Sequence, residues 1–273
     1  MTNKYSVLMS VYYKEQPEHL KLAMQSIIEQ TVRPDEFIII KDGPLTENLN
    51  SVIDSFISQQ PSLFTIIQNQ ENLGLGLSLA KGVLASKNEL IARMDSDDWV
   101  VPYRCEKELA VFKADPKLGM VGSLEVEFMG TPDNVLSIHK VPETNKEIEQ
   151  FMRRRCAVLH PTVMFKKSAV LRAGNYRDYI LYEDYDLFAR MVFDEKIKCY
   201  NLQEKLYYIR TSDEFFIRRG GISYAKTVLK FKWELFKKNN MSFIDFCISG
   251  LGQAFVCILP NTWRKVFYMK FLR

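Results

Sequence analysis

The sequence predicts an α/β fold in which a mostly parallel sheet is flanked by helices and followed by a basic helical tail. Short apolar runs alternate with segments of helical periodicity over about the first hundred residues, which is typical of parallel sheets covered by helices. With 273 residues, 47% of them hydrophobic, the chain can bury a substantial core. Its charge is uneven. Residues 217–273 hold eleven Lys/Arg and two Asp/Glu, whereas the other 216 residues hold 26 basic and 31 acidic ones.

The first half supplies four strand units and the helices between them. Runs rich in strand formers predict strands over 5–12, 36–40, 64–67 and 90–94. Apolar residues at helical spacing predict helices around 20–28, 52–57 and 75–85. The second half is less regular. Pro102 can open a helix that runs to about Ala114, and Glu183 to Val192 reads as another helix. Strands are expected over 119–129, 135–139, 162–165, 197–202 and 206–210.

The tail has a different pattern. Residues 223–238 place apolar side chains among five lysines, as in a basic amphipathic helix; 243–259 is apolar with polar interruptions, and 263–270 mixes aromatic with basic residues. Such a composition suits a bilayer surface, and the alternative is a helix packed on the body with a solvated lysine face. We therefore expect a body over 1–216, with halves at about 1–115 and 116–216, and a tail over 217–273.

Cysteine use and hydropathy indicate the compartment. The five cysteines are scattered and form no C-x-x-C pair, which fits reduced thiols rather than disulfides or a zinc site. No segment reaches the ~18 uninterrupted apolar residues of a membrane span. The first residues show no secretory signal. We expect a cytoplasmic protein that binds an anionic membrane surface peripherally.

Three carboxylates follow the fourth predicted strand, at Asp95, Asp97 and Asp98. In open α/β sheets ligands bind at the carboxyl ends of the strands, and crowded carboxylates suit Mg²⁺ or Mn²⁺ shared with substrate phosphates. The cluster therefore suggests a metal–diphosphate site, and the alternative is a solvated turn. An EF-hand is excluded because Val100 occupies the position of its invariant glycine.

Several motifs stand in a recognisable order along the chain. They are Ser10-Val11-Tyr12, Lys41-Asp42-Gly43-Pro44, Asn72-Leu73-Gly74, Asp95-Ser96-Asp97-Asp98 and Tyr182-Glu183-Asp184-Tyr185-Asp186-Leu187. Together they resemble the family 2 glycosyltransferases, inverting enzymes with a Rossmann-like fold called GT-A. The resemblance covers roughly residues 4–212 and is strongest to bacterial exopolysaccharide and O-antigen enzymes of the amylovoran-biosynthesis type.

The resemblance implies a role for each motif on the donor side. Nucleotide-binding residues would be Ser10, Tyr12, Asp42, Asn72, Gly74 and Asp95, with the first three holding the base and Asp95 the ribose. Asp97 and Asp98 would hold a divalent Mn²⁺ or Mg²⁺. Many relatives carry two acidic residues where this chain has Lys41 and Asp42, which leaves the donor preference open. A dinucleotide fingerprint is not expected, because Leu79 replaces its third glycine.

The acceptor side of the resemblance centres on Glu183 and Asp184. One of them, with Asp184 preferred and Asp186 in reserve, would be the base that deprotonates the acceptor hydroxyl. The alternative is that these acids only favour the start of a helix. Three further residues match family positions near the acceptor, namely His160, Arg177 and Arg190, although a lone histidine is more often structural.

The sequence thus predicts a metal-dependent inverting glycosyltransferase that uses a nucleotide sugar, with a UDP-linked hexose or N-acetylhexosamine preferred. Its acceptor would be a saccharide on a lipid diphosphate at the cytoplasmic face of a bacterial inner membrane. A sugar nucleotidyltransferase is the enzymatic alternative, but Tyr12-Tyr13-Lys14-Glu15 is not the Gly-rich loop that it needs. The other alternative is a membrane- or RNA-binding protein with a silent body, although no nucleic-acid partner is expected.

Overall fold

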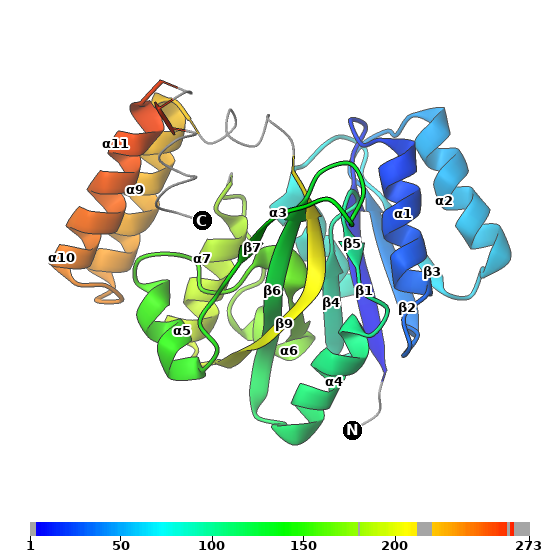
Figure 1. The fold of residues 1–273 in the computed structure, drawn as a ribbon, viewed down its shortest axis with the longest axis horizontal. Coiled ribbons are helices and arrows are strands. Elements are labelled where there is room, and N and C mark those ends of the chain that lie inside the picture. The colour runs from blue at the N-terminus through cyan, green and yellow to red at the C-terminus, as the bar shows by residue number, and fades with distance from the viewer. Residues whose placement is uncertain (1–3, 180, 212–219, 261–262, 265–273) are drawn as a thin grey trace.

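The computed structural model describes residues 4–179, 181–211, 220–260 and 263–264 (Figure 1). A nine-stranded sheet has the order β3-β2-β1-β4-β8-β6-β9-β5, and β7 pairs with β6. The strands are β1 (Tyr5–Val11), β2 (Glu36–Lys41), β3 (Phe64–Gln68), β4 (Leu90–Met94), β5 (Trp99–Val100), β6 (Leu118–Phe128), β7 (Val135–His139), β8 (Met164–Lys166) and β9 (Lys198–Arg210). The α-helices are α1 (Pro17–Ile28), α2 (Glu47–Gln59), α3 (Leu75–Ala85), α4 (Arg104–Ala114), α5 (Asn145–Met152), α6 (Lys167–Arg172), α7 (Glu183–Ala189), α9 (Ile222–Lys237), α10 (Phe243–Asp245) and α11 (Gly252–Ile258). Three further turns of helix are η1 (His160–Thr162), η2 (Arg190–Asp194) and η3 (Phe246–Leu251).

The first half confirms the predicted alternation of strands and helices. Strands β3, β2, β1 and β4 pair in parallel, with Ser10 opposite Ile40 and Met9 opposite Met94. Because parallel strands end at the same edge of a sheet, the segments after β1, β2 and β4 converge there. That edge carries the predicted donor-side motifs.

The second half is less regular than the first, as predicted, and it mixes parallel with antiparallel pairs. Strand β8 runs antiparallel to β4 and β6, and β5 runs antiparallel to β9, whereas β6 and β9 are parallel. Strand β9 is continuous where two separate strands were predicted, and shifts in its register with β6 around Leu124 absorb the irregularity. The helix expected over 183–192 is divided into α7 and the π-helical turn η2.

Alternate residues of the central strands separate two apolar cores. On one face Val7 and Met9 belong to the core that contains α1, α2 and α4. On the other face Leu8 and Ile38 pack with α3, α6 and α7. The tail joins this second core, because the apolar face of α9 is buried there together with α7, and α11 lies alongside α9 (Figure 1). The tail is therefore integrated with the body, and most of the predicted segment 263–270 lies outside the described residues.

Candidate active site

Asp42 ties the end of β2 to the loop before α3. Its carboxylate accepts hydrogen bonds from the backbone amides of Leu73 and Gly74, at 2.7 and 3.0 Å, and from the side chain of Asn69 at 3.0 Å. Asn72 donates to the Asp42 carbonyl at 3.4 Å. Gly74 has a φ of 85°, a left-handed conformation that favours glycine, at the position just before α3. The structure thus brings Asp42, Asn72 and Gly74 together, as the motifs predict.

Ser10 and Tyr12 lie at the adjacent end of β1. The amide of Asp42 donates to the carbonyl of Val11 at 2.8 Å, which places the two strand ends side by side. Tyr12 is exposed, and its ring meets that of Tyr13 edge-on, with 6.0 Å between ring centroids. An exposed aromatic ring next to a buried carboxylate offers a stacking surface and a hydrogen-bond acceptor to a nucleotide base.

The carboxylates after β4 have different surroundings. Asp98 is buried, and its two oxygens accept hydrogen bonds from the hydroxyl of Tyr207 at 2.9 Å and from the amide of Arg210 at 2.8 Å. Asp95 forms an ion pair with the buried guanidinium of Arg93. The backbone amide of Asp95 also donates to the Tyr207 hydroxyl at 3.1 Å. Asp98 therefore attaches the cluster to β9.

Asp97 lies between like charges. Burial, together with the neighbouring carboxylates of Asp95 and Glu15, raises the pKa of its carboxyl group to about 7. Glu15, which follows β1, accepts a hydrogen bond from the hydroxyl of Ser96 at 2.6 Å. A cation close to Asp97 would relieve this repulsion.

The cluster fits a cation that is shared with a substrate. Among the described residues, no group of three or more His, Cys, Asp or Glu is arranged to hold a metal ion by itself. Mg²⁺ is usually held by one or two carboxylates and completes its coordination with substrate phosphates and water. Asp97, with Asp95 beside it, satisfies that requirement. Both oxygens of Asp98, by contrast, already accept hydrogen bonds from residues of β9.

The start of α7 brings Glu183 towards the donor-side edge. A Cβ atom built on Gly76 would lie 2.7 Å from the carbonyl oxygen of Arg177 and 3.1 Å from the Cβ of Glu183, so the first turns of α3 and α7 touch. Burial, together with the charge of Asp184, raises the pKa of Glu183 to about 7. Asp95 acts on the same group, so the acidic pair of α7 and the carboxylate cluster share one electrostatic neighbourhood.

His160 is held inside the molecule. Its Nε2 atom lies 2.9 Å from the hydroxyl of Tyr176, and its ring packs edge-on against Phe188. Burial lowers the pKa of His160 well below its usual value, and the charge of Arg93 lowers it further. The histidine is therefore neutral at physiological pH and positions Tyr176 behind the carboxylates.

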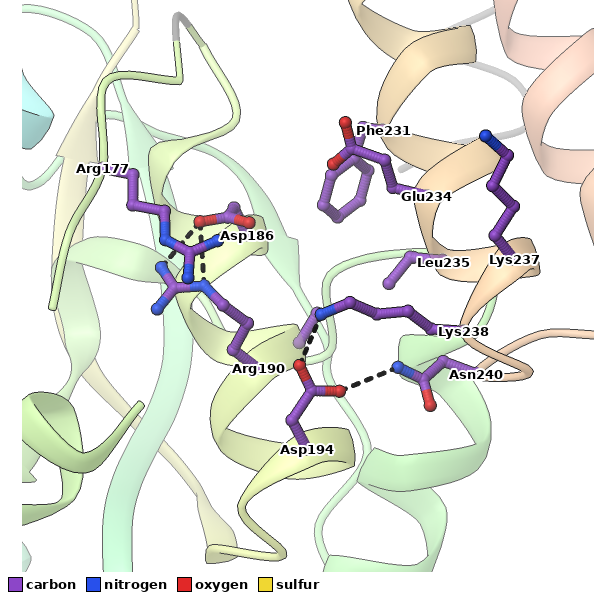
Figure 2. Close-up of a pocket in the computed structure, with 11 residues that line it drawn as sticks. Arg177, Asp186, Arg190, Asp194, Phe231, Glu234, Leu235, Lys237, Lys238 and Asn240 are labelled. Carbon is purple, nitrogen blue, oxygen red and sulfur yellow. Dashed lines mark hydrogen bonds and ion pairs between the residues drawn. The ribbon is translucent and has the colours of Figure 1, made fainter. Parts of the chain in front are cut away.

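The two predicted acceptor-side arginines lie at a different place from the carboxylate cluster. Arg190 is buried and binds the carboxylate of Asp186 through Nε at 3.0 Å and Nη2 at 2.6 Å. Arg177 is exposed, and Figure 2 shows both arginines in the wall of a cleft of about 270 Å³ between α7–η2 and α9. Lys238 pairs with Asp194 across this cleft at 2.7 Å.

Sequence reasoning missed Arg93. This arginine in β4 is buried, its Nε atom has no hydrogen-bond partner among the described residues, and its charge reaches Asp95, Tyr176 and Glu183. Its cation therefore lies between the two acidic groups of the site. The available signal was an arginine inside the apolar run Leu90–Met94, a position that normally excludes charge.

Known proteins match this chain over its full length, the tail included. The chain is 37% identical over 273 residues to an Escherichia coli protein named UDP-Gal:alpha-D-GlcNAc-diphosphoundecaprenol beta-1,3-galactosyltransferase, covering 100% of this chain and 98% of the relative. It is 32% identical to the amylovoran biosynthesis glycosyltransferase AmsE of Erwinia amylovora, over 97% of this chain and 98% of that one.

Solved structures show the same fold. The mannosyltransferase PcManGT from Pyrobaculum calidifontis, solved with GDP-Man and Mn²⁺, superposes with a TM-score of 0.62 at 16% identity, over 95% of this chain and 71% of that one. S. aureus TarS 1–349, solved with UDP-GlcNAc, superposes with a TM-score of 0.63 at 14% identity, over 98% and 76% of the two chains. The profile described as Glycosyl transferase family 2 matches residues 6–179. Taken with the full-length relatives, that match shows that this chain is a glycosyltransferase of family 2 with the GT-A fold.

Proposed function

We propose that the enzyme transfers a hexose or N-acetylhexosamine from a UDP-sugar to a saccharide on a lipid diphosphate, with inversion at the anomeric carbon. The observation that carries the proposal is the contact between the starts of α3 and α7, which brings Glu183 into the electrostatic neighbourhood of Asp95 after β4. The name of the Escherichia coli relative, which specifies UDP-Gal and a GlcNAc-diphosphoundecaprenol acceptor, supports the substrate class.

On the donor side, the base would lie at the ends of β1 and β2. Tyr12 would stack on it, with Ser10 beside it, and the Asp42 oxygen that receives only the Gly74 amide would accept a uracil N–H. Asn72 and Gly74 would shape the neighbouring loop. These assignments use groups whose positions are fixed before the donor arrives, which limits the ordering cost of binding.

The diphosphate would lie over the carboxylate cluster. Asp95 would contact the ribose, and Asp97 would hold Mn²⁺ or Mg²⁺ together with the diphosphate oxygens. When bound, such a cation stabilises the negative charge that accumulates on the departing UDP. We assign Asp98, whose oxygens are engaged by Tyr207 and Arg210, to holding β9 against this site.

On the acceptor side, Asp184 would act as the base. Its Oδ1 accepts the amide of Tyr185 at 2.7 Å, which helps to orient the carboxylate at the start of α7. Asp184 takes the hydroxyl proton as the acceptor oxygen bonds to the anomeric carbon. The bond from that carbon to the diphosphate breaks, and its electron pair leaves with UDP. His160 and Arg190 would support this side through Tyr176 and Asp186, and Arg177 would face the acceptor.

The proposal places the reaction at the cytoplasmic face of the inner membrane, in surface polysaccharide synthesis. It is tested by incubating the full chain and Mn²⁺ with UDP-sugars and a synthetic α-GlcNAc-diphosphate lipid. We expect one donor to give a longer lipid-linked saccharide, whose new linkage has the configuration opposite to that of the donor by NMR. A product with the donor's configuration, or pyrophosphate release in place of UDP, would contradict the proposal.

A further inference from the structure

An exposed apolar stripe runs along the last helical segment of the tail, from α10 through η3 to α11. Its side chains lie on one helical face and are each 50–66% exposed: Phe243, Ile244, Ile248, Leu251, Phe255 and Ile258. The five positions from Ile244 to Ile258 are separated by four, three, four and three residues, the spacing of a continuous helical stripe. A patch of this kind on a soluble surface marks an interaction site.

The body fixes the stripe in its outward orientation. The opposite side of the segment is buried, and a Cβ atom built on Gly250 would lie 3.3 Å from the Cβ of Lys232 in α9. The carboxylate of Asp245 forms an ion pair with Nε of Arg154 in the body at 2.5 Å. The carbonyl of Cys257 accepts a hydrogen bond from the amide of Gly221 at 2.9 Å. The apolar side chains therefore face away from the protein as a preformed surface.

The charges around the stripe suit an anionic partner. Residues 246–264 contain no acidic side chain, and Asp245 is already paired with Arg154. The neighbouring helix α9 exposes three lysines, Lys226, Lys230 and Lys237, and one acidic residue, Glu234, so its exposed side carries a net positive charge. Anionic headgroups would neutralise these cations, whereas a second copy of the chain would bring the same basic surroundings to both sides of the contact.

Alternative membrane attachments are less consistent with the structure. The sequence predicted surface binding for the tail over 217–273 as a whole, including the basic amphipathic helix over 223–238, but the apolar face of α9 is buried against α7. Among the described residues, no helix is long and apolar enough to cross a bilayer. A stripe of large apolar side chains beside exposed lysines is the pattern of a helix that lies in the plane of the interface.

We propose that residues 243–258 lie in the headgroup region of an anionic bilayer, with the stripe in contact with the acyl chains and the lysines of α9 at the phosphates. The choice of a bilayer agrees with the proposed lipid-linked acceptor, but attachment by this surface does not depend on catalysis. It holds α9, and through it α7 with the proposed base, at a fixed distance from the membrane.

The test is co-sedimentation of the full chain with vesicles that contain phosphatidylglycerol or only phosphatidylcholine. Wild type should bind the anionic vesicles more tightly, and the double variant Ile248→Ser/Phe255→Ser should lose at least about tenfold in partitioning, because two large side chains no longer leave water. The matched control Leu84→Ser/Leu136→Ser changes two exposed leucines on α3 and β7 and should bind like wild type.

Three measurements decide the experiment: UDP binding, vesicle binding and the oligomeric state. Calorimetric UDP binding, which should be unchanged in both double variants, shows that the body is folded and tests the donor site separately. Unchanged vesicle binding of Ile248→Ser/Phe255→Ser would overturn the proposal. The proposal would also be overturned if wild type does not bind vesicles but sediments as a dimer, and the variant sediments as a monomer. The stripe would then bind a second copy of the chain.

Discussion

At the residue scale, the motifs located most of the site, but they did not reveal which side chain connects its parts. Asp42, Asp95, Asp97 and Glu183 could be found because acidic residues follow strands or open a helix in a family order. Arg93 could not be found in this way, because its role depends on which residues of other elements lie around it in the folded protein. The division of labour between Asp97 and Asp98 was likewise hidden, since it depends on contacts with β9 more than a hundred residues later.

Arg93→Met tests the connecting role of this guanidinium. The charge of Arg93 lowers the pKa of Asp97, which must be ionised to hold the cation, so removal of Arg93 should move the acid limb of the kcat/KM profile to higher pH. The matched control is Arg104→Met, which removes a buried arginine paired with Glu108. It should destabilise the protein without moving the limb. An acid limb that stays in place in Arg93→Met would make the arginine purely structural.

Asp184→Asn and Glu183→Gln separate the two candidate bases. Asp184→Asn should bind the UDP-sugar normally but transfer the sugar ~10²–10⁴-fold more slowly, the usual contribution of a general base. Glu183→Gln should keep turnover and leave the acid limb in place, because Asp184 still accepts the proton of the acceptor hydroxyl. The reverse pattern in single-turnover kinetics would assign the base to Glu183.

At the element scale, the parallel half of the sheet was predictable and the second half only partly so. Apolar runs of five to seven residues separated by helical periodicity identify β1 to β4. Strand β8 was expected over 162–165 and lies at Met164–Lys166, whereas β5 has only two residues, too few for a periodic signal, and its place depends on a partner distant in sequence. The contact between α3 and α7 is also tertiary, and it is the contact that completes the site.

Gly76→Ala tests that contact. The added methyl group would meet a backbone carbonyl at 2.7 Å and the Cβ of Glu183 at 3.1 Å, so the two helix starts must separate. Overpacking of this kind typically costs about 1–3 kcal/mol. We expect a lower denaturation midpoint and reduced kcat with little change in UDP affinity. The control Gly252→Ala places a methyl group in open space and should leave stability and kcat at wild-type levels or slightly stabilise the protein. Equal behaviour of the two variants would show that the close approach does not position α7.

At the scale of the whole molecule, the tail is part of the catalytic body. Composition distinguished residues 217–273 but did not show which helical faces would be buried, because lysines are interleaved with apolar residues in α9 and no basic residue marks the outer face of 243–259. In the structure, α9 contributes Phe231 to a cluster of aromatic rings with Tyr179, Tyr182 and Tyr185. Truncation of the tail would therefore expose the core next to α7 and could not report on membrane binding alone.

Lys232 provides a pH-dependent measure of this docking. Its ammonium group is buried, donates to the carbonyl of Arg154 at 2.7 Å and the hydroxyl of Tyr185 at 3.0 Å, and burial lowers its pKa to about 7. Between pH 7 and the usual lysine range the unfolded chain keeps this proton and the folded chain does not, so the free energy of unfolding should rise with pH by up to ~1.4 kcal/mol per unit.

Lys232→Met should lose this part of the pH dependence, whereas the exposed control Lys226→Met should retain it. Denaturant unfolding at pH 7 and pH 9 gives the comparison for all three proteins. If the free energy of unfolding changes equally between the two pH values in wild type and in Lys232→Met, the lysine is hydrated in the folded protein. It would then not report on the packing of α9 against the body.

The most direct test of a cation shared between Asp97 and the donor diphosphate is UDP release from the preferred UDP-sugar, measured with Mn²⁺, with EDTA and in Asp97→Ala. We expect wild type to release UDP with Mn²⁺ and EDTA to abolish the release. Asp97→Ala should stay folded but remain inactive at any Mn²⁺ concentration. Release that persists in EDTA, or full Mn²⁺-dependent activity in Asp97→Ala, would contradict a cation shared between this carboxylate and the donor diphosphate.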